Sequence, residues 1–218
     1  MKQVQIFIIT ILSVISVSCQ NKQFDLSRIQ LNKNAEKYDL GKNGLFKKIP
    51  SSSDALIEYY SEDNRNLTFA EIPLDSSLST HISIYNNKIA SVEVYAKEKH
   101  SLQFAKTLEQ RLGTPTTILF DKQTIDNKTG HDVLVELKQA FPNDITQVED
   151  EPNTFKYPYL LFWNKDSIYY IFTFHIEWGD GRMRNQYYPL TKEAFHANKI
   201  QGYPYPLPAE SPLYNYLK

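Results

Sequence analysis

The chain has 218 residues, of which 41% are hydrophobic and 13% aromatic, so it can fill the core of one ordinary domain or two small ones. Its 24 lysines and arginines nearly balance 25 acidic residues, and this argues against nucleic-acid binding, which needs a clustered basic face. The chain has a single cysteine, which excludes an intramolecular disulfide.

An apolar run near the N-terminus ends at that cysteine. Lys2 gives the segment a positive start, an apolar stretch runs through residues 6–17, and the small residue Ser18 directly precedes Cys19. The segment resembles a bacterial lipoprotein signal peptide. The resemblance implies cleavage before Cys19, diacylation of that residue and anchoring of the new N-terminus in a membrane. Because Gln20 follows the cysteine, the sorting rule of that class implies the outer membrane.

Two other interpretations of this segment stay open, namely secretion without lipid and a retained N-terminal anchor. The apolar run of about 13 residues is shorter than the ~20 that a spanning helix needs, which favours a signal peptide. We therefore expect residues 1–18 to be a signal peptide, 19–43 a polar lipidated tether, and 44–218 a single domain. A softer boundary near the acidic, proline-bearing residues 142–157 remains an alternative.

The first predicted unit is a β-hairpin followed by a helix and a strand. Residues 67–72 read as a strand, and the alternating residues 80–85 and 88–96 flank Asn86-Asn87, which is typical of a tight hairpin turn. A helix then follows Ser101 and ends at Gly113, and residues 116–120 return as a strand. This predicted helix directs four residues inward, namely Leu102, Ala105, Leu108 and Leu112.

The second half of the chain also contains predicted strands and helices, but the sequence has no internal repeat with a fixed period. A helix is predicted over 132–141, a surface loop over 144–157, and a hairpin that pairs 159–164 with 167–178. Thr191 can cap a short helix that reaches Asn198. The sequence thus predicts an α+β fold, with a mainly antiparallel sheet built from two hairpins and two or three short helices packed on it.

Aromatic residues gather late in the chain, where 17 of the 29 lie at or after Phe155. Neighbours on a strand point to opposite faces, so adjacent tyrosines place rings on both faces of a sheet. The chain's own helices, a ligand or a partner could cover these rings. A candidate binding surface on this half of the chain contains Trp178, Tyr187, Tyr188, Tyr203 and Tyr205.

A weaker candidate polar site lies around the end of the second hairpin. His175 and Glu177 alternate along one strand face, and an imidazole beside a carboxylate suits acid–base chemistry. The turn that follows carries Asp180, Arg182 and Arg184 beside two glycines, which can cradle an anion. A solvated strand face and a flexible turn explain the same pattern. No catalytic residue, metal ligand or cofactor is predicted, because no H-E-x-x-H, G-x-S-x-G or S-x-x-K motif occurs in the mature chain.

Three functions are compatible with these features. The first is an envelope-anchored lipoprotein that binds a protein partner without catalysis, for example as an accessory or immunity protein. The second is a carbohydrate or small-ligand module that uses exposed aromatic rings. The third is a hydrolase built from carboxylates and His175. We expect the first, with a membrane and a protein as partners and no nucleic acid.

Overall fold

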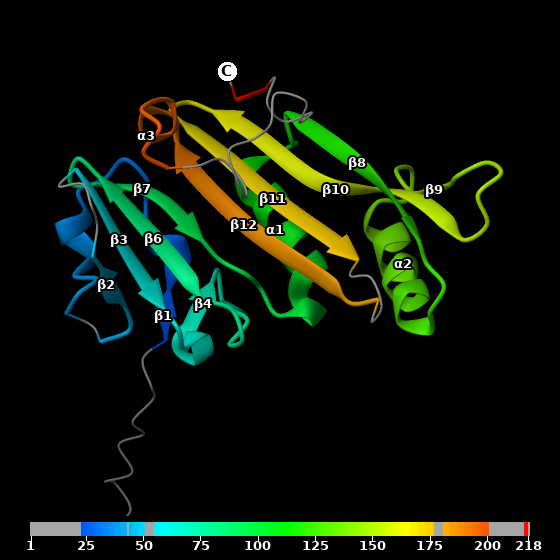
Figure 1. The fold of residues 1–218 in the computed structure, drawn as a ribbon, viewed down its shortest axis with the longest axis horizontal. Coiled ribbons are helices and arrows are strands. Elements are labelled where there is room, and N and C mark those ends of the chain that lie inside the picture. The colour runs from blue at the N-terminus through cyan, green and yellow to red at the C-terminus, as the bar shows by residue number, and fades with distance from the viewer. Residues whose placement is uncertain (1–22, 43, 51–54, 177–180, 201–215, 218) are drawn as a thin grey trace, which may run out of the picture.

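A large antiparallel β-sheet forms the centre of the computed structural model, which describes residues 23–42, 44–50, 55–176, 181–200 and 216–217 (Figure 1). Every pairing described in this sheet is antiparallel, and β9 adds a short pair to β10. The strands follow one another across the sheet in the order β2 (Lys47–Ile49), β3 (Leu56–Ser61), β6 (Thr80–Tyr85), β7 (Lys88–Glu93), β12 (Met183–Thr191), β11 (Ile168–Ile176), β10 (Thr154–Lys165) and β8 (Thr117–Thr124), with β9 at Thr146–Gln147.

The predicted α+β fold with a mainly antiparallel sheet is confirmed, but the sheet is larger than the two predicted hairpins. Strand β12 joins them into one sheet, because it pairs along its whole length with β11 and meets β7 through Leu190 and Ser91. Its sequence, MRNQYYPLT, mixes arginine, amides and a proline, so it was not recognised as a strand. The partly exposed Arg184, Gln186 and Tyr188 alternate with the buried Met183, Asn185 and Tyr187, and the last three residues of the strand are buried.

Both predicted hairpins are present, each closed by a two-residue turn. In β6–β7 the turn residues Asn86 and Asn87 have φ angles of 50° and 62°, as a type I′ turn requires. In β10–β11 Lys165 pairs with Ile168, so the turn is Asp166-Ser167, and the first strand extends one residue beyond the predicted 159–164. Glu177 and Trp178, at the end of the second predicted hairpin, lie outside the described residues.

Two helices cover one face of the sheet, which we call the core face. α1 (Ser101–Leu112) and α2 (Lys128–Ala140) pack there, and Figure 1 shows α1 behind the sheet. In α1 the predicted inward residues Ala105 and Leu108 are each 1% exposed, whereas Leu102 and Leu112 are half-buried at the edge of the stripe. Phe104, which the predicted stripe left out, is fully buried and stacks edge-on against Phe172 of β11.

The opposite face, which we call the open face, carries a second and smaller apolar cluster at one end. The short helix α3 (Lys192–His196) covers this end, and Thr191 caps it as predicted by accepting a hydrogen bond from the Ala194 N–H at 3.4 Å. Tyr169 is buried beneath α3, while the adjacent Tyr170 packs against the core-face cluster. The predicted placement of neighbouring rings on both faces is therefore confirmed, and the chain itself covers much of this aromatic surface.

The segment predicted as a tether is shorter than expected, because the folded domain includes residues well before 44. β1 (Phe24–Asp25) pairs in parallel with β4 (Leu67–Phe69), and β5 (Ile72–Pro73) completes a three-stranded sheet. Leu26, Ile29 and Leu40 are buried in the main core. The segment does not look apolar in sequence because only one of its sides is buried. Burial of one side requires an apolar residue at only every second to fourth position, and the residues between them are polar. Short 3-10 helices also occur in the fold, namely η1 (Leu26–Arg28), η2 (Ala35–Tyr38), η3 (Asn64–Asn66) and η4 (Glu98–His100).

The strand predicted over residues 67–72 is interrupted by a tight turn. Ala70 and Glu71 have φ angles of 50° and 67°, and they reverse the chain so that Phe69 pairs with Ile72. Residues other than glycine, asparagine and aspartate seldom adopt such angles, so the sequence carried no signal for this turn. None of the helices described in the structure is long and apolar enough to cross a membrane.

Candidate functional site

One end of the open face, which none of the described helices covers, carries a group of polar and aromatic side chains that we call the polar patch. It lies across β3, β6, β7 and β12, beyond the end that α3 covers, and no described helix lies in front of it in Figure 1. Strand register and alternation bring these residues to one face. The patch consists of Glu58, Tyr60, His81, Glu93, Tyr95, Arg184, Gln186 and Tyr188, all of them partly exposed.

A hydrogen-bonded triad orders the middle of the patch. The Gln186 Nε2 amide donates to the Glu93 carboxylate and, at 3.0 Å, to the Tyr95 hydroxyl. The Tyr95 hydroxyl in turn donates to Glu93 Oε1. Glu93 lies on β7, Tyr95 follows that strand and Gln186 lies on β12, so the triad ties the first predicted hairpin to β12. Side chains held in this way lose less conformational entropy when they bind a partner.

Tyr188 lies near two carboxylates at the centre of the patch. Burial raises the pKa of the Tyr188 phenol to about 12, although a hydrogen bond with Ser91 opposes the rise. Glu93 and Glu58 raise the same pKa further because their negative charges disfavour a phenolate. The phenol therefore stays neutral at physiological pH in a locally negative environment. Such an environment attracts a cation, and a tyrosine ring gives that cation a second favourable contact.

One tyrosine ring at the edge of the patch contacts a cation. At the outer edge Lys47 of β2 lies over the Tyr60 ring at 5.8 Å from its centroid and forms a 3.0 Å ion pair with Glu62. The Tyr60 ring also stacks on His81, with ring centroids 6.4 Å apart. Cation–π contacts of this kind contribute about 0.5–1 kcal/mol at exposed sites. The patch thus combines aromatic faces, carboxylates and amides on one surface.

The residues of the predicted binding surface do not lie together in the structure. Tyr187 is 4% exposed and packs edge-on against Phe69 and Phe104, so its inclusion in an exposed surface was wrong. The reason is the alternation of the strand, which turns Tyr188 to the open face when Tyr187 faces the core. Tyr188 is thus the member that the structure places on the patch. Trp178, Tyr203 and Tyr205 lie outside the described residues.

The weaker predicted polar site is described only in part. The backbone of His175 pairs with Arg184, which shares the open face with Tyr188, and Arg182 is exposed next to it. Glu177 and Asp180 lie outside the described residues, so the acid–base pairing with His175 stays a prediction.

The glycine turn before Arg182 has a packing role that the sequence did not reveal. Gly181 has a φ of 71°, and a Cβ there would collide with the Asn127 Oδ1 and lie 2.5 Å from the Gly130 amide nitrogen. Asn127 caps α2 by accepting a 2.7 Å hydrogen bond from that same amide. Glycine is therefore required because the turn rests directly on the start of α2.

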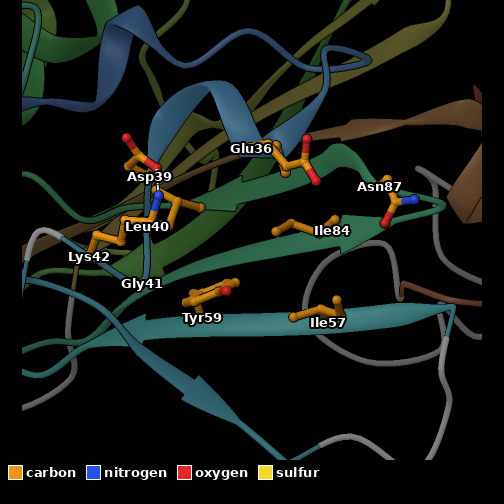
Figure 2. Close-up of a pocket in the computed structure, with 10 residues that line it drawn as sticks. Glu36, Asp39, Leu40, Gly41, Lys42, Ile57, Tyr59, Ile84 and Asn87 are labelled. Atoms are coloured by element: carbon orange, nitrogen blue, oxygen red, sulfur yellow. Dashed lines mark ion pairs between the residues drawn. The ribbon is translucent and has the colours of Figure 1, made fainter.

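A pocket of about 560 Å³ lies on the core face, away from the patch (Figure 2). Tyr59 and Ile57 of β3 form one wall, and η2 with the loop that follows it forms the other, bearing Glu36 and Asp39. Asp39 forms a 3.0 Å ion pair with Lys42, and both side chains are more than half exposed. Exposed pairs of this kind contribute little to stability, so the charges remain available to a polar ligand.

Sequence reasoning missed Glu58, Glu93, Tyr95 and Gln186. The alternation of charged or polar residues with buried ones along β7 and β12 was the one available signal, but it could not show that the two strands lie side by side. Among the described residues, no group of three or more His, Cys, Asp or Glu side chains is placed to hold a metal ion.

Comparison of the chain with protein-family models, with curated proteins and with solved structures finds no match in any of the three. Function therefore has to be inferred from the chain's own residues and their arrangement.

Proposed function

We propose that this protein is a lipoprotein of the bacterial cell envelope, anchored in the outer membrane through Cys19, which binds a protein partner without catalysis. The observation that carries the binding role is the polar patch, an ordered set of tyrosines, carboxylates and an amide on a sheet face that none of the described helices covers. Tyrosine and arginine are enriched at protein interfaces because they bury a large area and keep a polar group.

The chemistry of the patch favours a basic partner segment. Glu58 and Glu93 lie close enough to Tyr188 to raise its pKa, so a lysine or arginine from a partner would meet two carboxylates and an aromatic face there. Arg184, on the same strand as Tyr188, can add a contact to an acidic group. An accessory or immunity protein that recognises a basic surface is the form of binding that this arrangement supports.

Anchoring strengthens such binding without a larger interface. A lipid on Cys19 would hold the domain near the membrane, where a partner at the same membrane meets it at high effective concentration. The first described strand begins at Phe24, so at most a few residues separate the folded domain from the proposed lipid. The domain would then work close to the membrane surface.

The anchor is tested by metabolic labelling with a fatty acid. We expect the unchanged chain to incorporate label and Cys19→Ser to remain uncleaved and unlabelled. Label retained by the serine variant would contradict lipidation at Cys19. Fractionation into the inner membrane would contradict outer-membrane sorting.

The partner role is tested by chemical cross-linking in intact cells, followed by purification of the tagged full chain and mass spectrometry. Glu58→Gln with Glu93→Gln removes both charges while keeping side-chain volume, and we expect it to abolish the recovery of one envelope protein. Glu136→Gln, on the exposed face of α2, removes the same kind of charge elsewhere and is expected to change nothing. Equal recovery with all three chains would contradict the proposal.

A second candidate function is the binding of a sugar or another small polar ligand in the pocket of Figure 2. The half-buried Tyr59 ring lines one pocket with the Asn87 amide and the Glu36 and Asp39 carboxylates, and this combination favours it. Glycan-array binding that Tyr59→Ala removes and that Glu93→Gln leaves intact would favour this function over the protein partner.

A further inference from the structure

A second pocket, of about 240 Å³, enters the core face between the N-terminal segment, the end of α1 and the strands β11 and β12. We call it the Arg111 pocket. Most of its lining is apolar and buried, with Leu26 and Ile29 on one side and Val92 beneath. Ligand pockets for drug-sized molecules usually measure about 300–1,000 Å³, so any occupant here is small.

Arg111 brings a positive charge to this pocket. Its guanidinium lies over the Phe69 ring at 5.6 Å from the centroid, and Nη2 donates a 3.3 Å hydrogen bond to the Ser27 carbonyl. These contacts fix the side chain but leave its charge without a carboxylate among the residues that the structure describes. A planar guanidinium has five N–H donors in a fork that matches a carboxylate, and one of them donates to a residue of the described chain.

Two tyrosine hydroxyls line the same pocket. Tyr187 is 4% exposed, yet its hydroxyl forms no hydrogen bond with any residue of the described part of the chain. Burial raises the pKa of Tyr187 far above its usual range, Tyr170 raises it further and Arg111 lowers it, so the three polar groups lie near one another. A buried tyrosine hydroxyl normally has a hydrogen-bond partner. Here the Tyr187 hydroxyl faces the pocket, where it can donate a hydrogen bond to a ligand.

We infer that the Arg111 pocket binds a small carboxylic acid with an apolar body. The carboxylate would accept hydrogen bonds from the Arg111 guanidinium at the rim and from the Tyr187 hydroxyl inside. The apolar body would lie against Leu26, Ile29 and Val92, which exclude water. The positive charge and the hydrogen-bond donors of the pocket thus match the carboxylate, and its apolar walls match the apolar body. A neutral or cationic molecule of the same size would lack the attraction to the positive charge. This site is separate from the polar patch and does not depend on the proposed partner.

Hexanoate is a suitable probe because it is short, unbranched and negatively charged. The full chain, purified in a non-ionic detergent with empty micelles as the blank, would be titrated with hexanoate, 1-hexanol and hexylamine by saturation-transfer NMR. We expect saturable hexanoate binding below about 10 mM, and binding of the alcohol and the amine at least about tenfold weaker.

Three variants assign the binding to the pocket. Arg111→Gln is expected to weaken hexanoate binding at least about tenfold, because a hydrogen bond to a charged group is lost. Tyr187→Phe should also weaken it while leaving the thermal stability of the ligand-free protein unchanged, since the hydroxyl has no partner to lose. Lys106→Gln, an exposed charge on the same helix, serves as the matched control and should bind as the unchanged chain does.

Two results would overturn the inference. The first is equal binding of hexanoate and hexanol, or no saturable hexanoate binding up to about 10 mM. The second is an unchanged affinity in Arg111→Gln. If Tyr187→Phe lowers the thermal stability of the ligand-free protein, the hydroxyl has a partner within the chain and is not available to the carboxylate, which contradicts its role in the site. Because Arg111 is exposed, its variant is expected to fold, and Arg111→Lys, which keeps the charge but not the fork, gives an independent check.

Discussion

Replacing Asn185 with alanine is expected to destabilise the fold by about 2–6 kcal/mol. The Asn185 side chain is buried on β12, where its Oδ1 accepts a 2.8 Å hydrogen bond from the Ala96 N–H and its Nδ2 donates a 2.8 Å bond to the Ala96 carbonyl. Nδ2 also donates to the Ser101 hydroxyl at 2.7 Å. One amide thus joins β12 to the chain that leads from β7 into α1.

The magnitude follows from the groups that alanine would leave without partners. Ala96 is 2% exposed, and the strand bonds beside it run from the Asp75 N–H to the Tyr95 carbonyl and from the Lys97 N–H to the Pro73 carbonyl, so neither supplies Ala96 with a partner. A buried backbone group without a partner costs about 1–3 kcal/mol, and two such groups give the range above. The Ser101 hydroxyl keeps its 2.7 Å bond to the Glu98 carbonyl and adds little.

Urea denaturation followed by far-UV circular dichroism measures this loss as a change in midpoint at constant slope. Gln103→Ala, an exposed amide on α1, is the control and should change the free energy of unfolding by no more than about 0.5 kcal/mol. A loss below about 1 kcal/mol for Asn185→Ala would refute the reasoning, because the Ala96 groups would then have another partner.

Three further predictions concern the core, a turn and alkaline stability. Leu108→Ala should cost about 2–5 kcal/mol in the same urea assay, because Leu108 is 1% exposed, and a loss below about 0.5 kcal/mol would contradict the core face of α1. Gly181→Ala should lower stability by at least about 2 kcal/mol, while Gly41→Ala, which has only ordinary contacts and no positive φ, should be nearly neutral. Burial raises the pKa of Tyr157 to about 12, so the folded state holds this proton more tightly than the unfolded state, with its ordinary pKa of about 10. Stability should therefore be unaffected by this group below about pH 10 and fall by about 2–3 kcal/mol as the pH rises through about 12, and a Tyr157→Phe variant with an equally steep alkaline fall would contradict the assignment.

Local patterns were sufficient to predict the two hairpins and the first helix. Asn86-Asn87 tolerates positive φ on both sides of alternating strands, and Ala105 and Leu108 repeat with helical spacing. In both cases residues close in sequence determine the structure. The register of β6 with β7 and the buried stripe of α1 follow from that local information.

The remaining features depend on contacts between distant segments. Strand β12 is stabilised by partners that lie elsewhere in the chain, so its own sequence does not predict it. In the predicted tether, residues 19–43, the buried Leu26 and Leu40 stand among polar residues and give no local pattern. The same limit applies to the site. The pair Tyr187-Tyr188 was recognised as important, but which ring faces outward depends on the register of β12 with β11.

The central claim, that the polar patch binds a protein partner, is tested most directly by photo-cross-linking in living cells. A photoreactive phenylalanine analogue would replace Tyr188 in the full chain, and in a control chain it would replace Phe120, which is 37% exposed on the distant edge strand β8. We predict one specific cross-linked envelope protein from position 188 and none from position 120, with the position 188 product lost when Glu58 and Glu93 are changed to glutamine. No cross-link from position 188 in a correctly anchored chain, or the same products from both positions, would contradict the account.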